Sequence, residues 1–134
     1  AKSSPIQVGS DTTWSKITSL RSGAAAVKTD GTLWTWGYND KGQLGHNNTT
    51  QYSSPTQIPG TTWSNVTSTI QSIIAVKTDA TMWSWGYDQF GELGLNESGD
   101  PARISSPTQI TGDWKQGVRK MGSTMNGFMA IKDL

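Results

Sequence analysis

The chain has 134 residues, of which 33% are hydrophobic, and its formal charge of +1 arises from 11 basic and 10 acidic residues. Since there is no run of like charge and no apolar stretch near the roughly 20 residues that span a bilayer, we expect neither a nucleic-acid nor a membrane partner. The absence of cysteine excludes disulfides, a thiolate nucleophile and cysteine metal ligands.

Turn residues divide the first part of the chain into four short expected strands, at Ile6–Val8, Trp14–Ser19, Ala24–Thr29 and Thr32–Gly37. The series then returns with a period close to 50, and each copy opens with Ser-Pro-x-Gln-Ile or Ser-Pro-x-Gln-Val. The later strands are expected at Thr56–Ile58, Trp63–Ser68, Ile73–Thr78 and Thr81–Gly86 in the second copy and at Thr108–Ile110, Trp114–Lys120 and Phe128–Lys132 in the third. No Trp-x-Trp-Gly strand follows in the third copy before Leu134, so we expect this copy to be a truncated one.

Four strands per copy are typical of a β-propeller blade. We predict an all-β chain with blades of four antiparallel strands, forming one propeller segment over residues 1–134. Its about two and a half repeats lie at 3–52, 53–104 and 105–134. Propellers usually close with about four to eight blades. We therefore expect a partial propeller, which is either a segment of a longer polypeptide or a protomer that associates head to tail, with its C-terminal strand sharing a blade with the next chain's N-terminal strands.

The hairpin between the third and fourth expected strands differs between the first two copies. Asp30-Gly31 is a favoured two-residue turn, because Gly31 can adopt a positive φ without strain. The second copy has Asp79-Ala80 at this place. Since alanine tolerates positive φ poorly, the second turn is expected to be strained or of another type.

All seven tryptophans fall on only three positions of the repeat. Alternation along a strand places the two tryptophans of each Trp-x-Trp pair on the same face, where large indoles can fill the space between stacked sheets. Stacking of exposed indoles on a sugar ligand is the alternative. We predict that the set forms the structural core: Trp14, Trp34, Trp36, Trp63, Trp83, Trp85 and Trp114.

The sequence from Ala24 to Gly45, followed by Ser-Pro-x-Gln-Ile, resembles the regulator of chromosome condensation repeat. In the first copy the matching residues are Gly37, Asn39, Gly42, Gln43, Leu44 and Gly45. In the second they are Gly86, Gly91, Leu93 and Gly94, with Asp88 and Glu92 as near matches. The Thr- and Asn-rich style is most similar to bacterial and bacteriophage members, in which the repeats imply a β-propeller used as a surface or virion module. Family-like blade bounds would place one blade at Ala24–Ser68 and the next at Ile73–Lys120.

No catalytic or metal-binding constellation is evident. The acidic residues stand singly in turns, where aspartate usually binds the backbone, and His46 has no partner at a triad-like spacing. We therefore expect no enzyme activity, cofactor or metal. Loops held by a rigid scaffold usually carry binding. The candidate binding residues are those of the loops after each Trp-x-Trp-Gly: Tyr38, Asn39, Asp40 and Lys41, and Tyr87, Asp88, Gln89 and Phe90.

These observations favour a non-catalytic structural or protein-binding propeller module. Its expected partners are other protein chains, through self-association or as the remainder of a larger propeller, and the resemblance implies a place in a virion or at a cell surface. The first alternative is a lectin-like propeller in which Tyr38, Tyr87 and Phe90 stack on glycans. A third is a scaffold of the nucleotide-exchange type known for the eukaryotic founder of the family, although nothing in the sequence matches its partner-binding residues.

Overall fold

Ten strands make up the computed structural model, which describes residues 10, 12–88, 93, 103–110, 118–124 and 127–132. In the last two ranges only the backbone is described. The strands are β1 (Trp14–Leu20), β2 (Gly23–Lys28), β3 (Leu33–Gly37), β4 (Tyr52–Ile58), β5 (Trp63–Ser68), β6 (Ser72–Lys77), β7 (Met82–Tyr87), β8 (Arg103–Ile110), β9 (Val118–Thr124) and β10 (Gly127–Lys132). The predicted strand at 6–8 and Trp114 lie outside the described residues. Among the described residues there is no helix long and apolar enough to cross a membrane.

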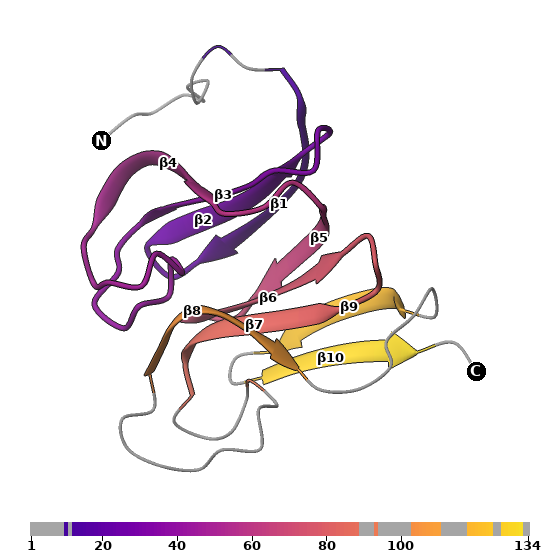
Figure 1. Ribbon diagram of the computed structural model, residues 1–134. Helices are drawn as coiled ribbons and strands as arrows, with labels where there is room; N and C mark the ends of the chain where they lie inside the picture. Colours follow the sequence, from indigo (N-terminus) through magenta and orange to yellow (C-terminus); the bar gives the residue numbers. More distant parts are fainter. Residues whose placement is uncertain are drawn as a thin grey trace.

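The strands form three antiparallel sheets. Their orders are β1-β2-β3-β4, β5-β6-β7-β8 and β9-β10, and Figure 1 shows the sheets following one another like the blades of a fan. The all-β prediction is therefore confirmed, and the molecule is a partial propeller.

The expected blade bounds at Ala24–Ser68 and Ile73–Lys120 are wrong. Each four-stranded sheet begins with the strand that carries Trp14 or Trp63, and it ends with the Ser-Pro-x-Gln-Ile strand. The reason is the length of the connections: the tight turn at Arg21–Ser22 returns the chain beside β1, so β1 pairs with β2. The connection at 59–62 instead carries the chain to the next sheet, where β5 pairs with β6.

The first two strands of every sheet pair in the same register. Ser19 pairs with Ala24 in the first sheet, Ser68 with Ile73 in the second, and Ser123 with Phe128 in the third. Each ladder also has an irregularity just before its terminal lysine, which is Lys28, Lys77 or Lys132. β9 and β10 are therefore the first half of a third unit of the same kind.

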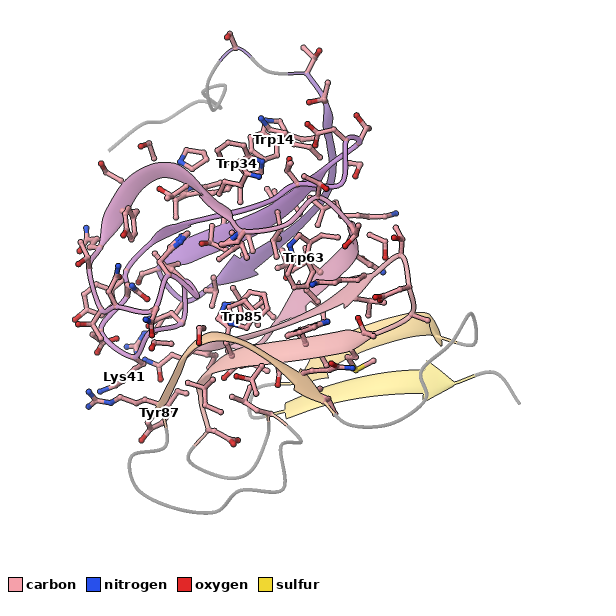
Figure 2. All side chains as sticks on the ribbon, in the orientation of Figure 1. Trp14, Trp34, Lys41, Trp63, Trp85 and Tyr87 are labelled. Atoms are coloured by element: carbon pink, nitrogen blue, oxygen red, sulfur yellow. The ribbon has the colours of Figure 1, made fainter. Side chains whose placement is uncertain are left out.

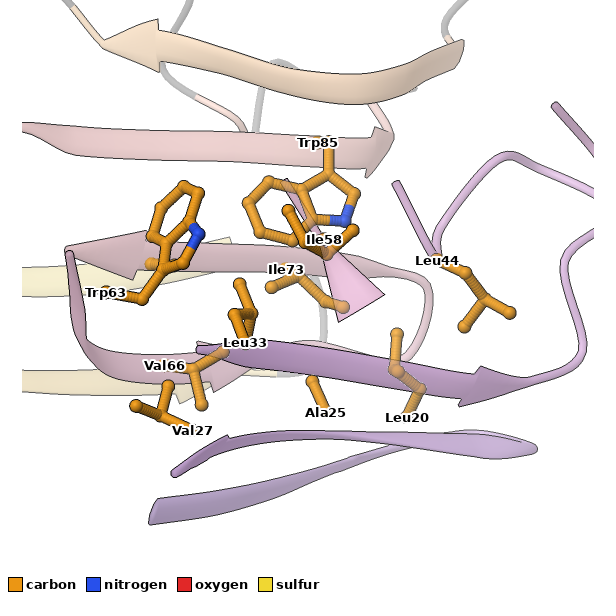
Figure 3. Close-up of a cluster of buried hydrophobic side chains, with 11 residues drawn as sticks. Leu20, Ala25, Val27, Leu33, Leu44, Ile58, Trp63, Val66, Ile73 and Trp85 are labelled. Atoms are coloured by element: carbon orange, nitrogen blue, oxygen red, sulfur yellow. The ribbon is translucent and has the colours of Figure 1, made fainter. Parts of the chain in front are cut away.

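The hydrophobic core lies between the first two sheets (Figure 3). The alternation of side chains along strands gives each sheet one aliphatic and one aromatic face, and the aliphatic face of the first sheet packs against the aromatic face of the second. The first sheet contributes Leu20, Ala25, Val27, Leu33 and Ile58, its β3–β4 loop contributes Leu44, and the second sheet contributes Trp63, Val66, Ile73, Ala75 and Trp85. Trp85 is 0% exposed, and it is the largest fully buried side chain of the described residues.

Polar contacts fix how the second sheet sits on the first. The amide of Trp63 donates to the carbonyl of Gly31 at 3.0 Å, and the amide of Arg21 donates to the carbonyl of Ile70 at 2.9 Å. The hydroxyl of Ser68 donates to the carbonyl of Ser19 at 2.7 Å. Since these bonds use mostly backbone atoms, they define a docking geometry that another sheet of the same shape could repeat.

The two hairpin turns have the same conformation despite their different residues. Gly31 has φ 84° and Ala80 has φ 67°, so the expected strain at Ala80 is confirmed and no other turn type is adopted. In each turn the aspartate accepts hydrogen bonds from the amide and hydroxyl of the threonine two residues later, at 3.1 and 2.6 Å for Asp30 and 3.0 and 2.6 Å for Asp79. The hydroxyl of Thr81 is the main cause that lowers the pKa of the Asp79 carboxyl, followed by its amide.

Candidate binding surfaces

Lys41 and Tyr87, one residue from each of the two stretches predicted to carry binding, lie close together at one end of the sheets (Figure 2). The Nζ atom of Lys41 lies 5.7 Å from the ring centroid of Tyr87, and it also approaches Asp40 at 3.6 Å. Tyr38 is 48% exposed. Gln89 and Phe90 fall outside the described residues. The structure thus brings together Asp40, Lys41 and Tyr87, and Tyr38 is exposed at the start of the same β3–β4 loop. We call this part of the molecule the loop end.

Asn39 occupies a different place from its loop neighbours, because it is 1% exposed. Its Oδ1 accepts a hydrogen bond from the amide of Leu44 at 2.9 Å, and its Nδ2 donates to the carbonyls of Asn48 and Thr50 at 3.1 and 2.8 Å. Asp88 repeats this arrangement by accepting from the amide of Leu93 at 2.9 Å. Both side chains therefore hold their own loops in shape and are not presented to a partner.

Replacing Asn39 by alanine should destabilise the protein by about 1–3 kcal/mol, because the buried amide of Leu44 and two carbonyls lose their partner. Denaturant unfolding measures the change. Thr49→Ala, in the exposed part of the same loop, is the matched control and should stay within about 0.5 kcal/mol of the wild type. Equal stability of the two variants would show that the loop does not depend on Asn39.

The β3–β4 loop also joins the two large sheets. Leu44 lies in the shared core, and the amide of Asn47 donates to the carbonyl of Ser105 in β8 at 2.7 Å. A Cβ added at Gly45 would lie 2.6 Å from Nε1 of Trp85, so only glycine allows this close approach. Gly42, where an added Cβ would lie 2.6 Å from Cβ of Ser105, and Gly45 therefore serve packing between the two sheets.

His46 lies in this loop beside the buried Thr35. The hydroxyl of Thr35 donates to the carbonyl of Leu44 at 2.7 Å, so Nε2 of neutral His46, 2.8 Å away, is inferred to be the donor to the Thr35 oxygen. The ring of His46 also packs edge-on to that of Tyr52, with centroids 4.8 Å apart. Burial lowers the pKa of the His46 imidazole below its ordinary value of 6.5 and outweighs the opposing effect of hydrogen bonding at Thr35.

This lowered pKa predicts that stability falls as the solution is acidified. Since the unfolded chain binds a proton at His46 more readily than the folded chain, the stabilisation is fully present above about pH 6.5 and is lost as the pH falls through the folded-state pKa. Thermal unfolding between pH 5 and pH 8 measures the slope. His46→Gln should flatten it in this range, and an unchanged slope would assign the pH dependence to other groups.

One face of the first sheet has no sheet packed against it among the described residues. It contains Ile17, which is 72% exposed, and the half-buried Trp14, Trp34 and Trp36. We call this surface the open face. On the second sheet the register equivalents of Trp14, Ile17 and Trp36 are Trp63, Val66 and Trp85, and all three are buried against the first sheet. Figure 2 shows Trp14 and Trp34 on the outer side of the first sheet and Trp63 and Trp85 between the sheets.

A lysine lies between two of the indoles on each aromatic face. Nζ of Lys28 lies 4.7 and 4.3 Å from the rings of Trp14 and Trp34. Lys77 lies 4.8 and 4.3 Å from the rings of Trp63 and Trp83. These distances are those of cation–π contacts, and Nε1 of Trp34 and of Trp83 also donates to the hydroxyl of Thr32 or Thr81 at 2.8 Å. The open face is therefore already organised like the covered face of the second sheet.

The uneven exposure of the tryptophans could not be predicted from their spacing. Of the six in the described part of the chain, Trp63 and Trp85 are buried, whereas Trp14, Trp34, Trp36 and Trp83 are half-buried. The available sequence signal was the contrast between Ala24 and its larger equivalent Ile73, since a small residue at this position fills less of an interface. Within the described residues no group of three or more His, Cys, Asp or Glu could hold a metal ion.

Comparison with known proteins supports a repeat of the regulator of chromosome condensation (RCC1) type. The family model described as "Regulator of chromosome condensation (RCC1) repeat" matches residues 30–72. Over 34 residues, a quarter of the chain, the sequence is 53% identical to "Protein RCC2 homolog" of Danio rerio and 50% identical to "Protein RCC2" of Homo sapiens. These segments cover 7% and 6% of the two relatives.

Solved structures show the same fold over most of the chain. Human WBSCR16 superposes with a TM-score of 0.76 and 19% identity over 89% of this chain, and Prp20p of Saccharomyces cerevisiae with a TM-score of 0.74 and 18% identity over 95%. The matched parts are 30% and 32% of those chains, so the present chain spans about a third of their length. The fold is therefore that of an RCC1-type β-propeller, of which this chain forms some of the blades.

Proposed function

We propose that the chain is a non-catalytic propeller module that binds other protein chains. The open face is the observation that carries this proposal: Ile17 and three half-buried tryptophans form an apolar surface whose equivalent in the second sheet is an interface. Contiguous apolar surfaces of this kind usually mark protein interaction sites. The described side chains that match the family motif serve the loops and the core, which favours a scaffold over a catalyst; they are Asn39, Gln43, Leu44, Asp88 and Leu93.

The structural neighbours support protein binding as the general role. One solved structure is described as Kap60 bound to yeast RCC1 (Prp20), and another concerns the binding of Prp20p to Gsp1p and histones. At 20% and 18% identity these likenesses establish only the fold, so those partners are not transferred to this chain.

We place the module in a virion or at a cell surface of a bacteriophage or bacterium. Two observations support this proposal. The composition is near-neutral and rich in Ser, Thr and Asn, and the Thr- and Asn-rich repeats resemble those of bacterial and bacteriophage members of the family. Mass spectrometry of purified particles and of the surface fraction from the source would detect the chain there. Its recovery only with internal cellular proteins would contradict the proposed location.

Site-specific crosslinking tests protein binding directly. A photo-reactive residue at position 17 should join the chain to another protein in the native source, because Ile17 is exposed on the open face. The same residue at the exposed loop position 49 is the matched control and should give less product. Absence of any protein adduct at position 17 would contradict the proposed function.

A lectin-like role is the second candidate, and the loop end favours it. Tyr38 is 48% exposed in the β3–β4 loop, and aromatic rings of this kind can stack on a sugar. Tyr87, with Lys41 over its ring, is the second aromatic residue of the proposed site. A glycan array separates the two functions. Specific binding that is lost in Tyr38→Ala or Tyr87→Ala would favour the lectin, whereas a silent array would favour protein binding.

A further inference from the structure

The third sheet repeats the register of the sheets that precede it. In β10, Met129 stands at the register position of Ala25 and Ile74, and Ile131 stands at that of Val27 and Val76. Ala25 and Val27 belong to the aliphatic face of the first sheet, against which the second sheet packs. The sequence thus places aliphatic residues at the positions of the third sheet that would meet a following aromatic face.

The other end of the molecule presents that aromatic face. Trp14, Ile17 and Trp36 stand at the positions of Trp63, Val66 and Trp85, which fill the interface between the first two sheets. Ser19 stands at the position of Ser68, whose hydroxyl donates to the carbonyl of Ser19 in the first sheet. The first sheet therefore offers both the apolar groups and the hydroxyl that the second sheet uses to dock.

We propose that the occupant of the open face is a second copy of this chain, which docks there, head to tail, the face of its β9–β10 sheet on which Met129 and Ile131 stand. This inference rests on the proposed function and names the partner. The aromatic face of one copy then meets aliphatic positions of the next, as in the internal interface. The hydroxyl of Ser19 donates to the backbone at Ser123 of the second copy, by analogy with the internal Ser68–Ser19 bond.

Such a contact uses two different surfaces and is therefore heterologous. Heterologous contacts generate rings when the rotation closes and open filaments when it does not. Because propellers close into rings of about four to eight blades, we expect a ring rather than a filament. Association should consequently proceed beyond a dimer as the protein concentration rises.

Sedimentation velocity of the purified chain tests the association. The 14.5 kDa wild type should form larger species as its concentration rises. Ile17→Lys should weaken association by about tenfold or more, because it inserts a charge into the apolar surface that would be buried on docking. Thr49→Lys adds the same charge in an exposed loop and should leave association unchanged. A wild type that stays monomeric, or an Ile17→Lys variant that associates normally, would overturn the proposal.

Mixing two defective variants distinguishes head-to-tail from face-to-face contact. Ile17→Lys blocks the open face and Ile131→Lys blocks the opposite end, so each alone should be monomeric. Together they should form a capped 1:1 dimer through their intact ends. No dimer on mixing would overturn the head-to-tail arrangement, provided that circular dichroism shows both variants folded.

A cysteine pair covers the case in which Ile131→Lys does not fold. Because the natural chain has no cysteine, mixing Ile17→Cys with Met129→Cys should give one specific intermolecular disulfide under mild oxidation. Ile17→Cys mixed with Thr49→Cys should give little. Equal yields from the two mixtures would overturn the proposal, whereas crosslinking of position 17 to a different protein in the source would leave the proposed function standing.

Discussion

Replacing Trp85 by alanine is expected to destabilise the protein by about 3–5 kcal/mol, the range for a large aromatic residue in a packed core. Trp85 is fully buried and belongs to the cluster between the first two sheets. Its ring centroid lies 6.1 Å from that of Trp63. Its removal leaves a cavity lined by both sheets and by the β3–β4 loop. Domains of this size have total stabilities of about 5–15 kcal/mol, so urea unfolding should show a large shift of the midpoint.

Trp36→Ala is the matched control, because Trp36 holds the same register position on the open face. Its indole is half-buried, so its removal should cost about half as much or less in the dilute chain. Equal losses for the two variants would mean that the open face is covered in the isolated molecule.

Gly31→Ala is expected to destabilise the protein by about 2–4 kcal/mol. Gly31 has φ 84°, a conformation that costs an L-residue about 1–2 kcal/mol. In addition, a Cβ at this position would overlap the carbonyl oxygen of Thr61, which belongs to the connection into the second sheet. The overlap with backbone forces the hairpin away and weakens the bond from the Trp63 amide to the Gly31 carbonyl. Thermal unfolding should show the loss.

The reverse change at the equivalent turn is the control. Ala80 has φ 67°, so Ala80→Gly relieves strain while adding freedom to the unfolded chain. The two effects nearly cancel, and the change should stay within about 1 kcal/mol of zero. A loss at Ala80→Gly as large as that at Gly31→Ala would refute the explanation from turn geometry.

The repeat predicted the strands well, because the tryptophans and turn residues recur along the sequence with the same period as the sheets. It did not predict which strand opens a sheet, since the Ser-Pro-x-Gln-Ile strand begins the sequence copy but closes the sheet. That assignment depends on the short turn at Arg21–Ser22 and the longer passage at 59–62, whose three-dimensional course is not encoded in the period.

The candidate site was predicted only in part. Loop position suggested exposure for all of Tyr38–Lys41, yet the short amide of Asn39 turns inward to bind three backbone groups of its own loop. The reappearance of an acceptor at Asp88, five residues before Leu93, was the available signal for this role. The open face was not predicted, because residues of the same type at the equivalent positions of the next repeat form a buried interface.

Hydroxyl-radical footprinting at low and high protein concentration tests the central claim, that the first sheet exposes an interface which the second sheet buries. In the dilute chain, Trp14, Ile17 and Trp36 should be oxidised several times faster than Trp63, Val66 and Trp85. In the assembled protein the first set should become as protected as the second. Equal oxidation of both sets in the dilute chain, or an open face that stays reactive after assembly, would contradict the account.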